Sequence, residues 1–178
     1  MAEFGYHTIG GISAPDFNDD VVYAGVRAAA TATGIVTSIF LYCDCATAGQ
    51  DMKFGIYTDS GNSPNTKIGT ETEFVNVGTW SAEWHEFGGL NYSVSNGVYY
   101  WLAVSLVNDM TIYYASVGET EYYYQGASGY GNSWPSPFIT TDDPSITLSM
   151  YAIITVAGGV APTGTLFGPF GGPLRGVL

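Results

Sequence analysis

The feature of this sequence that most constrains its fold is a succession of short segments in which apolar and polar side chains alternate. β-branched and aromatic residues fill the segments, and Gly, Asn, Asp, Ser and Pro separate them. Alternation puts successive side chains on opposite faces of an extended strand, whereas a helix needs a period of about 3.6 residues. The pattern predicts strands at residues 4–9, 21–27, 35–43, 52–58, 67–75, 80–87, 98–107, 110–117 and 146–156.

The segment at residues 35–43 is apolar on both of its faces. Ile39 and Leu41 lie on one side, and Phe40 and Tyr42 lie on the other. Because a strand at the edge or the surface of a sheet has one polar side, this segment is predicted to be a central strand.

Residues 98–117 contain two strand patterns with Asn108 and Asp109 between them. These two residue types tolerate the backbone conformations of tight turns, so we expect a single hairpin here. Residues 26–33 include three consecutive alanines but no apolar helical stripe, and they are expected to form at most one helical turn.

Turn signals recur about every 8–12 residues, and no amphipathic helix is evident. The sequence therefore predicts an all-β protein, an antiparallel β-sandwich of jelly-roll type spanning residues 1–156. Residues 157–178 are predicted to form a separate, extended C-terminal arm.

Composition limits the partners that this chain can have. The net charge is −12, and the four cationic residues (Arg27, Lys53, Lys67 and Arg175) are scattered along the sequence. Nucleic-acid binding needs a clustered basic surface, and an anionic membrane repels a protein of this charge. With 46% hydrophobic residues the chain can bury a core, so disorder is not expected either.

The start of the sequence shows neither a basic segment nor an apolar segment of a secretion signal. The body, by contrast, is rich in Tyr, Gly and Thr and poor in charge, as in extracellular proteins. Cys43 and Cys45 are too close in sequence for a useful disulfide and do not match zinc spacing, so we expect two reduced, buried thiols.

The C-terminal arm has seven glycines and three prolines among residues 157–178, together with large apolar side chains. Its prolines exclude it from a helix or a central strand. Apolar groups on such an arm require a surface to dock on, either the parent sandwich or a neighbouring subunit. The predicted interface residues in the arm are Leu166, Phe167, Phe170, Leu174, Val177 and Leu178.

A Tyr-rich region at residues 113–138 is the second candidate for contacts. Tyr122, Tyr123 and Tyr124 are consecutive and cannot all face one core, so some ring surface is expected to be exposed. Such rings suit a protein interface. They also suit stacking on sugars, for which the candidates are Trp84, Trp134 and Tyr130.

No catalytic residue is predicted, and an enzyme is the least favoured class. Residues 83–86 place two glutamates near His85, but no nucleophile or phosphate loop accompanies them. Asp16, Asn18 and Asp20 have the spacing at which a calcium loop opens, but the glycine and glutamate of that loop are missing. They are weak calcium candidates, and no cofactor is expected.

Five segments carry a resemblance to a known kind of module: residues 4–10, 34–39, 54–64, 97–104 and 148–152. Together they resemble a β-sandwich module of phage virion proteins and of secreted microbial multidomain proteins. The resemblance implies a jelly-roll or lectin-like fold and display outside the cell or on a virion.

The resulting hypothesis is a non-enzymatic accessory protein of a phage-like virion, either capsid decoration or a head- or tail-fibre component. It would be made in the host cytoplasm and displayed on the particle exterior, with itself (as a homo-oligomer such as a trimer) and other virion proteins as partners. The alternatives are a glycan-binding, lectin-like module and a subunit of an extracellular fibre.

Overall fold

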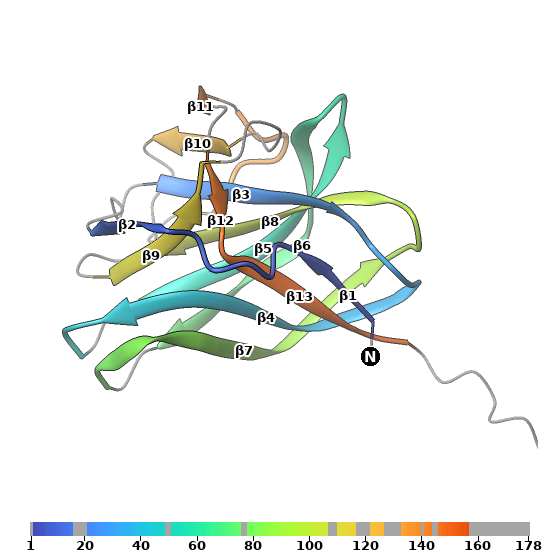
Figure 1. Ribbon diagram of the computed structural model, residues 1–178. Coiled ribbons are helices and arrows are strands. Elements are labelled where there is room, and N and C mark those ends of the chain that lie inside the picture. Colours follow the sequence, from blue (N-terminus) through green and yellow to red (C-terminus); the bar gives the residue numbers. More distant parts are fainter. Residues whose placement is uncertain are drawn as a thin grey trace, which may run out of the picture.

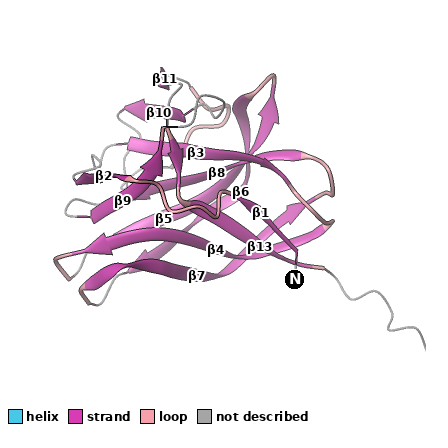
Figure 2. Cartoon of the chain, viewed as in Figure 1, coloured by secondary structure: helices cyan, strands magenta, loops and turns pink. Residues whose placement is uncertain are grey.

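The structure is a computed structural model that describes residues 2–15, 21–48, 51–75, 78–106, 110–116, 122–126, 133–139, 141–143 and 146–156. For residues 14–15, 122–126 and 141–143 only the backbone is described. Within these ranges the chain is all-β, with thirteen strands in two antiparallel sheets (Figures 1 and 2). The described residues include no helix with the length and hydropathy to cross a membrane.

Sheet A contains seven of the strands. They are β1 (Ala2–Gly5), β2 (Ile12–Pro15), β4 (Gly34–Cys45), β7 (Trp80–Val94), β9 (Met110–Ala115), β12 (Thr147–Leu148) and β13 (Met150–Thr155). β4 lies in its middle: β7 pairs with one edge of β4, and β13 and then β9 pair with the other.

Sheet B contains the other six strands, in the order β11-β10-β3-β8-β5-β6. Their bounds are β3 (Val21–Ala29), β5 (Asp51–Ser60), β6 (Ser63–Val75), β8 (Tyr99–Leu106), β10 (Tyr122–Gly126) and β11 (Thr141–Asp143).

The main core lies between the two sheets, because the inward side chains of both sheets belong to one hydrophobic cluster. Ile39 and Leu41 of sheet A and Phe54 and Leu102 of sheet B are fully buried in it. Aromatic contacts also join the two sheets, since Phe54 of sheet B stacks on Phe87 of sheet A with 4.6 Å between ring centroids. Burying each such side chain contributes about 1.5–3 kcal/mol to folding before the entropy of ordering is subtracted.

The prediction of an all-β protein is confirmed, and so is the central position of the 35–43 segment, now β4. The alternation explains this success: Ile39, Leu41 and Cys43 face the core, and Phe40 and Tyr42 face away from it.

One local prediction was wrong. The segments expected to form one hairpin, β8 and β9, lie in different sheets, because the chain crosses from sheet B to sheet A between them. Here pairing with distant strands overrode the local preference of the sequence. The segment at residues 26–33, expected to form at most one helical turn, forms none: Val26 to Ala29 continue β3, paired with β8, and residues 31–33 form a bend. Strands β2, β10 and β11 were not predicted at all.

Candidate functional site

The face of sheet A that points away from the core carries a group of aromatic side chains. Its first members come from β4, where Phe40 and Tyr42 alternate with the buried Ile39 and Leu41. Phe40 and Tyr42 are only partly buried. The same alternation that fills the core therefore also places two rings on the outer surface.

The register between strands adds rings from distant parts of the chain. Trp84 of β7 lies directly opposite Tyr42, and Tyr151 of β13 lies directly opposite Phe40. Residues paired in this way project from the same face of a sheet. Both added rings are partly exposed.

A change of strand partner at Ser149 brings in one more ring. β12 pairs with β9, whereas β13 pairs with β4. Between them the Ser149 N–H donates to the carbonyl oxygen of Tyr113 at 2.9 Å, and the Ser149 carbonyl accepts from the N–H of Tyr42 at 2.9 Å. Ser149 thus joins β4 and β9, which lets the Tyr113 and Tyr42 rings meet.

These rings contact one another in a continuous network. Tyr151 lies between Phe40, at 4.8 Å between centroids, and His7, at 4.1 Å, and both contacts are stacked. Trp84 meets the rings of Tyr42 and Tyr151 edge to face, at 5.5 and 5.1 Å. Tyr42 also meets Tyr113 edge to face, at 5.0 Å.

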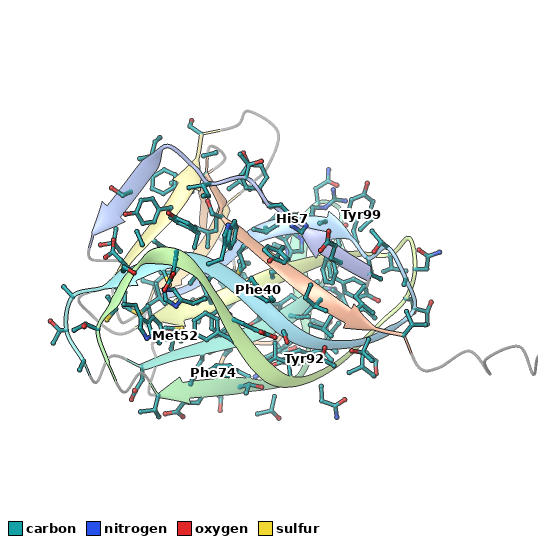
Figure 3. The ribbon with its side chains drawn as sticks, turned by 60° about the horizontal axis from the view of Figure 1, so that its bottom comes forward. His7, Phe40, Met52, Phe74, Tyr92 and Tyr99 are labelled. Atoms are coloured by element: carbon teal, nitrogen blue, oxygen red, sulfur yellow. The ribbon has the colours of Figure 1, made fainter. Side chains whose placement is uncertain are left out.

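We call this surface the aromatic face. Phe40 and His7 are labelled on it in Figure 3. It comprises six residues: His7, Phe40, Tyr42, Trp84, Tyr113 and Tyr151.

Carboxylates lie around the aromatic face. Glu86 Oε1 accepts a hydrogen bond from Ser38 Oγ at 2.7 Å, and Asp44 Oδ2 accepts one from the Tyr113 hydroxyl at 3.0 Å. Glu3 lies 3.9 Å from His7 Nε2.

The tyrosine hydroxyls respond to these charges. The hydrogen bond to Asp44 raises the pKa of Tyr113, because the carboxylate favours the protonated hydroxyl. Burial raises the pKa of Tyr151, and the negative charges of Glu3 and Glu86 raise it further. Both hydroxyls therefore remain neutral hydrogen-bonding groups at physiological pH.

Sheet B has an aromatic cluster on its outer face too, but there the chain covers it. Trp101 and Tyr57 are fully buried, although they lie on the side of the sheet away from the main core. Residues 133–139, which we call the covering segment, contribute Trp134 and Phe138 to this second cluster.

Close contacts hold the covering segment on sheet B. The Tyr57 hydroxyl donates to the Pro135 carbonyl at 3.0 Å, and the Phe138 N–H donates to the carbonyl of Asn65 at 2.8 Å. The Trp134 ring lies directly over Gly55, where an added Cβ would come within 2.7 Å of it. Gly55 is thus needed for its lack of a side chain.

Two ion pairs complete this covered face. Arg27 Nε and Nη2 donate to the two carboxylate oxygens of Asp59 at 2.8 and 3.0 Å, and Trp101 Nε1 donates to Asp59 Oδ1 at 2.9 Å. Lys67 Nζ pairs with Oε2 of Glu71, and Oε1 of Glu71 accepts a hydrogen bond from the backbone N–H of Trp134 at 3.3 Å.

Both carboxyl groups titrate below their usual range. The hydrogen bond from Arg27 holds the pKa of Asp59 below its ordinary value. Burial alone would raise the pKa of Glu71, but the hydrogen bond and charge of Lys67, together with hydrogen bonds from the backbone N–H groups of Glu71 and Trp134, outweigh burial and lower it.

The three residues predicted from the sequence to stack on a glycan lie in different environments or outside the described residues. Trp84 lies at the centre of the aromatic face. The prediction for Trp134 was wrong. Its side chain is only 3% exposed, and its ring is packed on Gly55 and Tyr57, so it has no free face for a sugar. Tyr130 lies outside the described residues.

Most predicted interface residues cannot be placed. The arm residues Leu166, Phe167, Phe170, Leu174, Val177 and Leu178 lie outside the described residues, as do the calcium candidates Asp16, Asn18 and Asp20. Tyr122, Tyr123 and Tyr124 form part of β10, which pairs with β3 and β11, and only their backbone is described.

Other residues singled out from the sequence have local partners. Cys43 and Cys45 are buried thiols that do not form a disulfide, as expected, and burial raises the pKa of Cys43. His85 stacks on Trp80 at 4.5 Å and contacts the Ser81 carbonyl, so it does not form a site with Glu86. Among the described residues no group of three or more His, Cys, Asp or Glu side chains could hold a metal ion.

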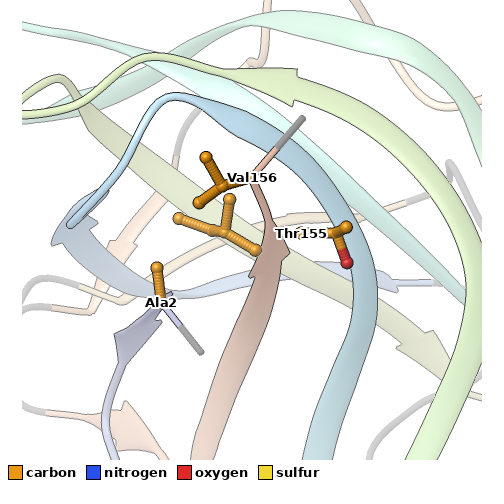
Figure 4. A pocket seen from close by; sticks show the side chains of 4 residues that line it. Ala2, Thr155 and Val156 are labelled. Atoms are coloured by element: carbon orange, nitrogen blue, oxygen red, sulfur yellow. The ribbon is translucent and has the colours of Figure 1, made fainter. Parts of the chain in front are cut away.

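A shallow, open hollow lies where β13 ends beside β1 (Figure 4). Its described lining is Ala2, Ile154, Thr155 and Val156, which offers no ionisable side chain. None of the six residues of the aromatic face is in this described lining, so the hollow is separate from the aromatic face.

The fold and site together define a two-sheet antiparallel β protein with a partly exposed aromatic surface. The sequence signal for this surface was present in the alternation of β4, but the pairing of Trp84 and Tyr151 with it depends on a long-range register. Comparisons of this chain with protein-family models, curated proteins and solved structures found no match.

Proposed function

We propose that the sandwich is a jelly roll. The support is the nesting of its strand pairs, because β1 pairs with β13, β3 with β8, β4 with β7 and β5 with β6. Taken as strands 1 to 8, these pair 1 with 8, 2 with 7, 3 with 6 and 4 with 5, as when a long hairpin is rolled up. Viral capsid proteins and lectins use this architecture.

The function that the geometry supports best is non-enzymatic recognition of a saccharide through the aromatic face. The observation that carries this proposal is the presence of five partly exposed aromatic rings and a histidine on one rigid sheet surface. Aromatic rings offer apolar contact to the C–H groups of a sugar, while tyrosine hydroxyls and carboxylates can bond its hydroxyls. Because the rings are fixed by their mutual contacts, binding would order few side chains.

Calorimetric titration with neutral hexasaccharides of glucose, mannose, galactose and N-acetylglucosamine tests this proposal. We expect at least one to bind, and Trp84→Ala to weaken that binding by about tenfold or more, which corresponds to the loss of one aromatic contact. Tyr99→Ala is the matched control, since Tyr99 is 45% exposed but belongs to sheet B. Failure of all four sugars to bind, or an equal loss in both variants, would contradict the proposal.

A second candidate is an accessory structural protein of a phage-like virion, displayed on the particle exterior and assembled as a homo-oligomer. It is compatible with saccharide binding. The observation that favours it is the sequence that follows β13, the neighbour of the edge strand β1: residues 157–178 combine glycines and prolines with large apolar side chains such as Leu166, Phe167 and Phe170.

Deletion of residues 157–178 tests this second candidate. Each arm side chain that docks on a neighbour would contribute about 1.5–3 kcal/mol before ordering costs. The full chain is expected to form an oligomer in light scattering and the truncated chain a monomer. The same oligomeric state in both would remove the arm from assembly.

A further inference from the structure

The charges around the aromatic face differ from those of the rest of the described surface. All three described lysines and arginines, Arg27, Lys53 and Lys67, belong to strands of sheet B. The described acidic residues of sheet A are Glu3, Asp44, Glu83 and Glu86. The aromatic face is therefore bordered by negative charges with no described lysine or arginine on its own sheet.

Three of these carboxylates contact the aromatic face or its immediate neighbours. Asp44 bonds the Tyr113 hydroxyl, Glu3 lies beside His7, and Glu86 bonds Ser38 next to Phe40. Glu3 and Glu86 act together on the Tyr151 hydroxyl, so both lie within electrostatic reach of the same ring. On sheet B, by contrast, Asp59 and Glu71 have their charges balanced by Arg27 and Lys67.

We propose that the aromatic face selects uncharged saccharides and rejects anionic ones. This inference rests on the proposed saccharide recognition and adds its selectivity. A carboxylate on the sugar would approach three protein carboxylates, and no described lysine or arginine of sheet A offsets their charge. Repulsion at distances of several ångströms in water, summed over three charges, weakens binding by about tenfold.

The experiment compares each neutral hexasaccharide that binds with the same oligosaccharide after oxidation of its primary alcohols to carboxylates. The neutral form is expected to bind about tenfold more tightly at low salt, and the difference is expected to shrink as salt is raised above about 0.1 M. Glu86→Gln should improve binding of the oxidised form. Glu73→Gln, which removes an exposed acid from β6 of sheet B, is the matched control and should not.

The outcomes separate the two proposals. If neutral and oxidised sugars bind equally, or the oxidised sugar binds more tightly, charge selection is overturned while saccharide recognition stands. Equal effects of Glu86→Gln and Glu73→Gln would also overturn it, because the discrimination would then follow the net charge of the whole molecule. If no saccharide of either kind binds, both proposals fail.

Discussion

The outer faces of the two sheets both carry clustered aromatic rings, yet the chain treats them differently. On sheet B, Trp101 is fully buried and Trp134 is only 3% exposed, because residues 133–139 cover this face. On sheet A, Trp84 and Tyr151 are left partly exposed. Aromatic surface that a protein covers with its own chain contributes to stability, and aromatic surface that it leaves open is available for recognition.

The carboxylates on the two outer faces also differ in their partners. On sheet B the carboxylates of Asp59 and Glu71 are paired with cations and also accept N–H groups of Trp101 and Trp134. On sheet A the described contacts of Asp44 and Glu86 are with hydroxyl groups, and Glu3 lies near His7. The comparison predicts that equivalent substitutions on the two faces have unequal effects.

The largest expected difference is between two tryptophan substitutions. Trp101→Ala should lower the free energy of unfolding by about 3–5 kcal/mol, because it leaves a cavity and removes the donor to Asp59. Trp84→Ala should lower it by about 1 kcal/mol, since its ring is partly in water and makes two edge-to-face contacts. Urea unfolding of both variants measures this, and equal losses would remove the distinction between the faces.

A smaller difference is expected between two glutamate substitutions. Glu71→Gln leaves the Lys67 ammonium without its carboxylate under the covering segment and should lower stability by about 1–3 kcal/mol. Glu86→Gln on sheet A should change stability by no more than about 0.5 kcal/mol, as for most exposed sites. Thermal unfolding followed by circular dichroism compares the two. A loss in the Glu71 variant no larger than that in the Glu86 variant would show that the covering segment does not depend on the ion pair.

The smallest expected effect is the loss of thermal stability at acidic pH. The folded protein lowers the pKa of both Asp59 and Glu71 below their ordinary values of 3.8 and 4.5. A lowered carboxyl pKa stabilises the fold above the ordinary value, and this stabilisation is lost as the pH falls through the folded value. The melting temperature should therefore drop as the pH falls below about 4.5, and it should drop less steeply in Glu71→Gln. If the melting temperatures of the unmodified protein and of Glu71→Gln depend on pH in the same way, the stabilising role given to the Glu71 carboxylate is contradicted.

Part of the difference between the two outer faces could be predicted from the sequence. Alternation predicted β4 and its two faces correctly, because Ile39 and Leu41 alternate with Phe40 and Tyr42 over a long segment. The aromatic face as a unit could not be predicted, since Trp84 and Tyr151 reach it through a register between strands that are far apart in sequence.

The covered face of sheet B was missed for a related reason. Trp134 lies among Gly, Asn, Ser and Pro, a composition typical of an exposed loop, and it was a candidate for sugar stacking. Its burial depends on a fit over Gly55 and on a hydrogen bond from Tyr57 to Pro135. Both are tertiary contacts, and no local pattern reports them.

The most direct test of recognition through the aromatic face uses the indole N–H signals of the four tryptophans in a proton–nitrogen NMR spectrum. Titration with the neutral hexasaccharides should shift the Trp84 signal and leave that of Trp101, which is bonded to Asp59 on the other sheet, unchanged. Shifts confined to Trp101 or Trp134, or no shift at any sugar concentration, would contradict the account.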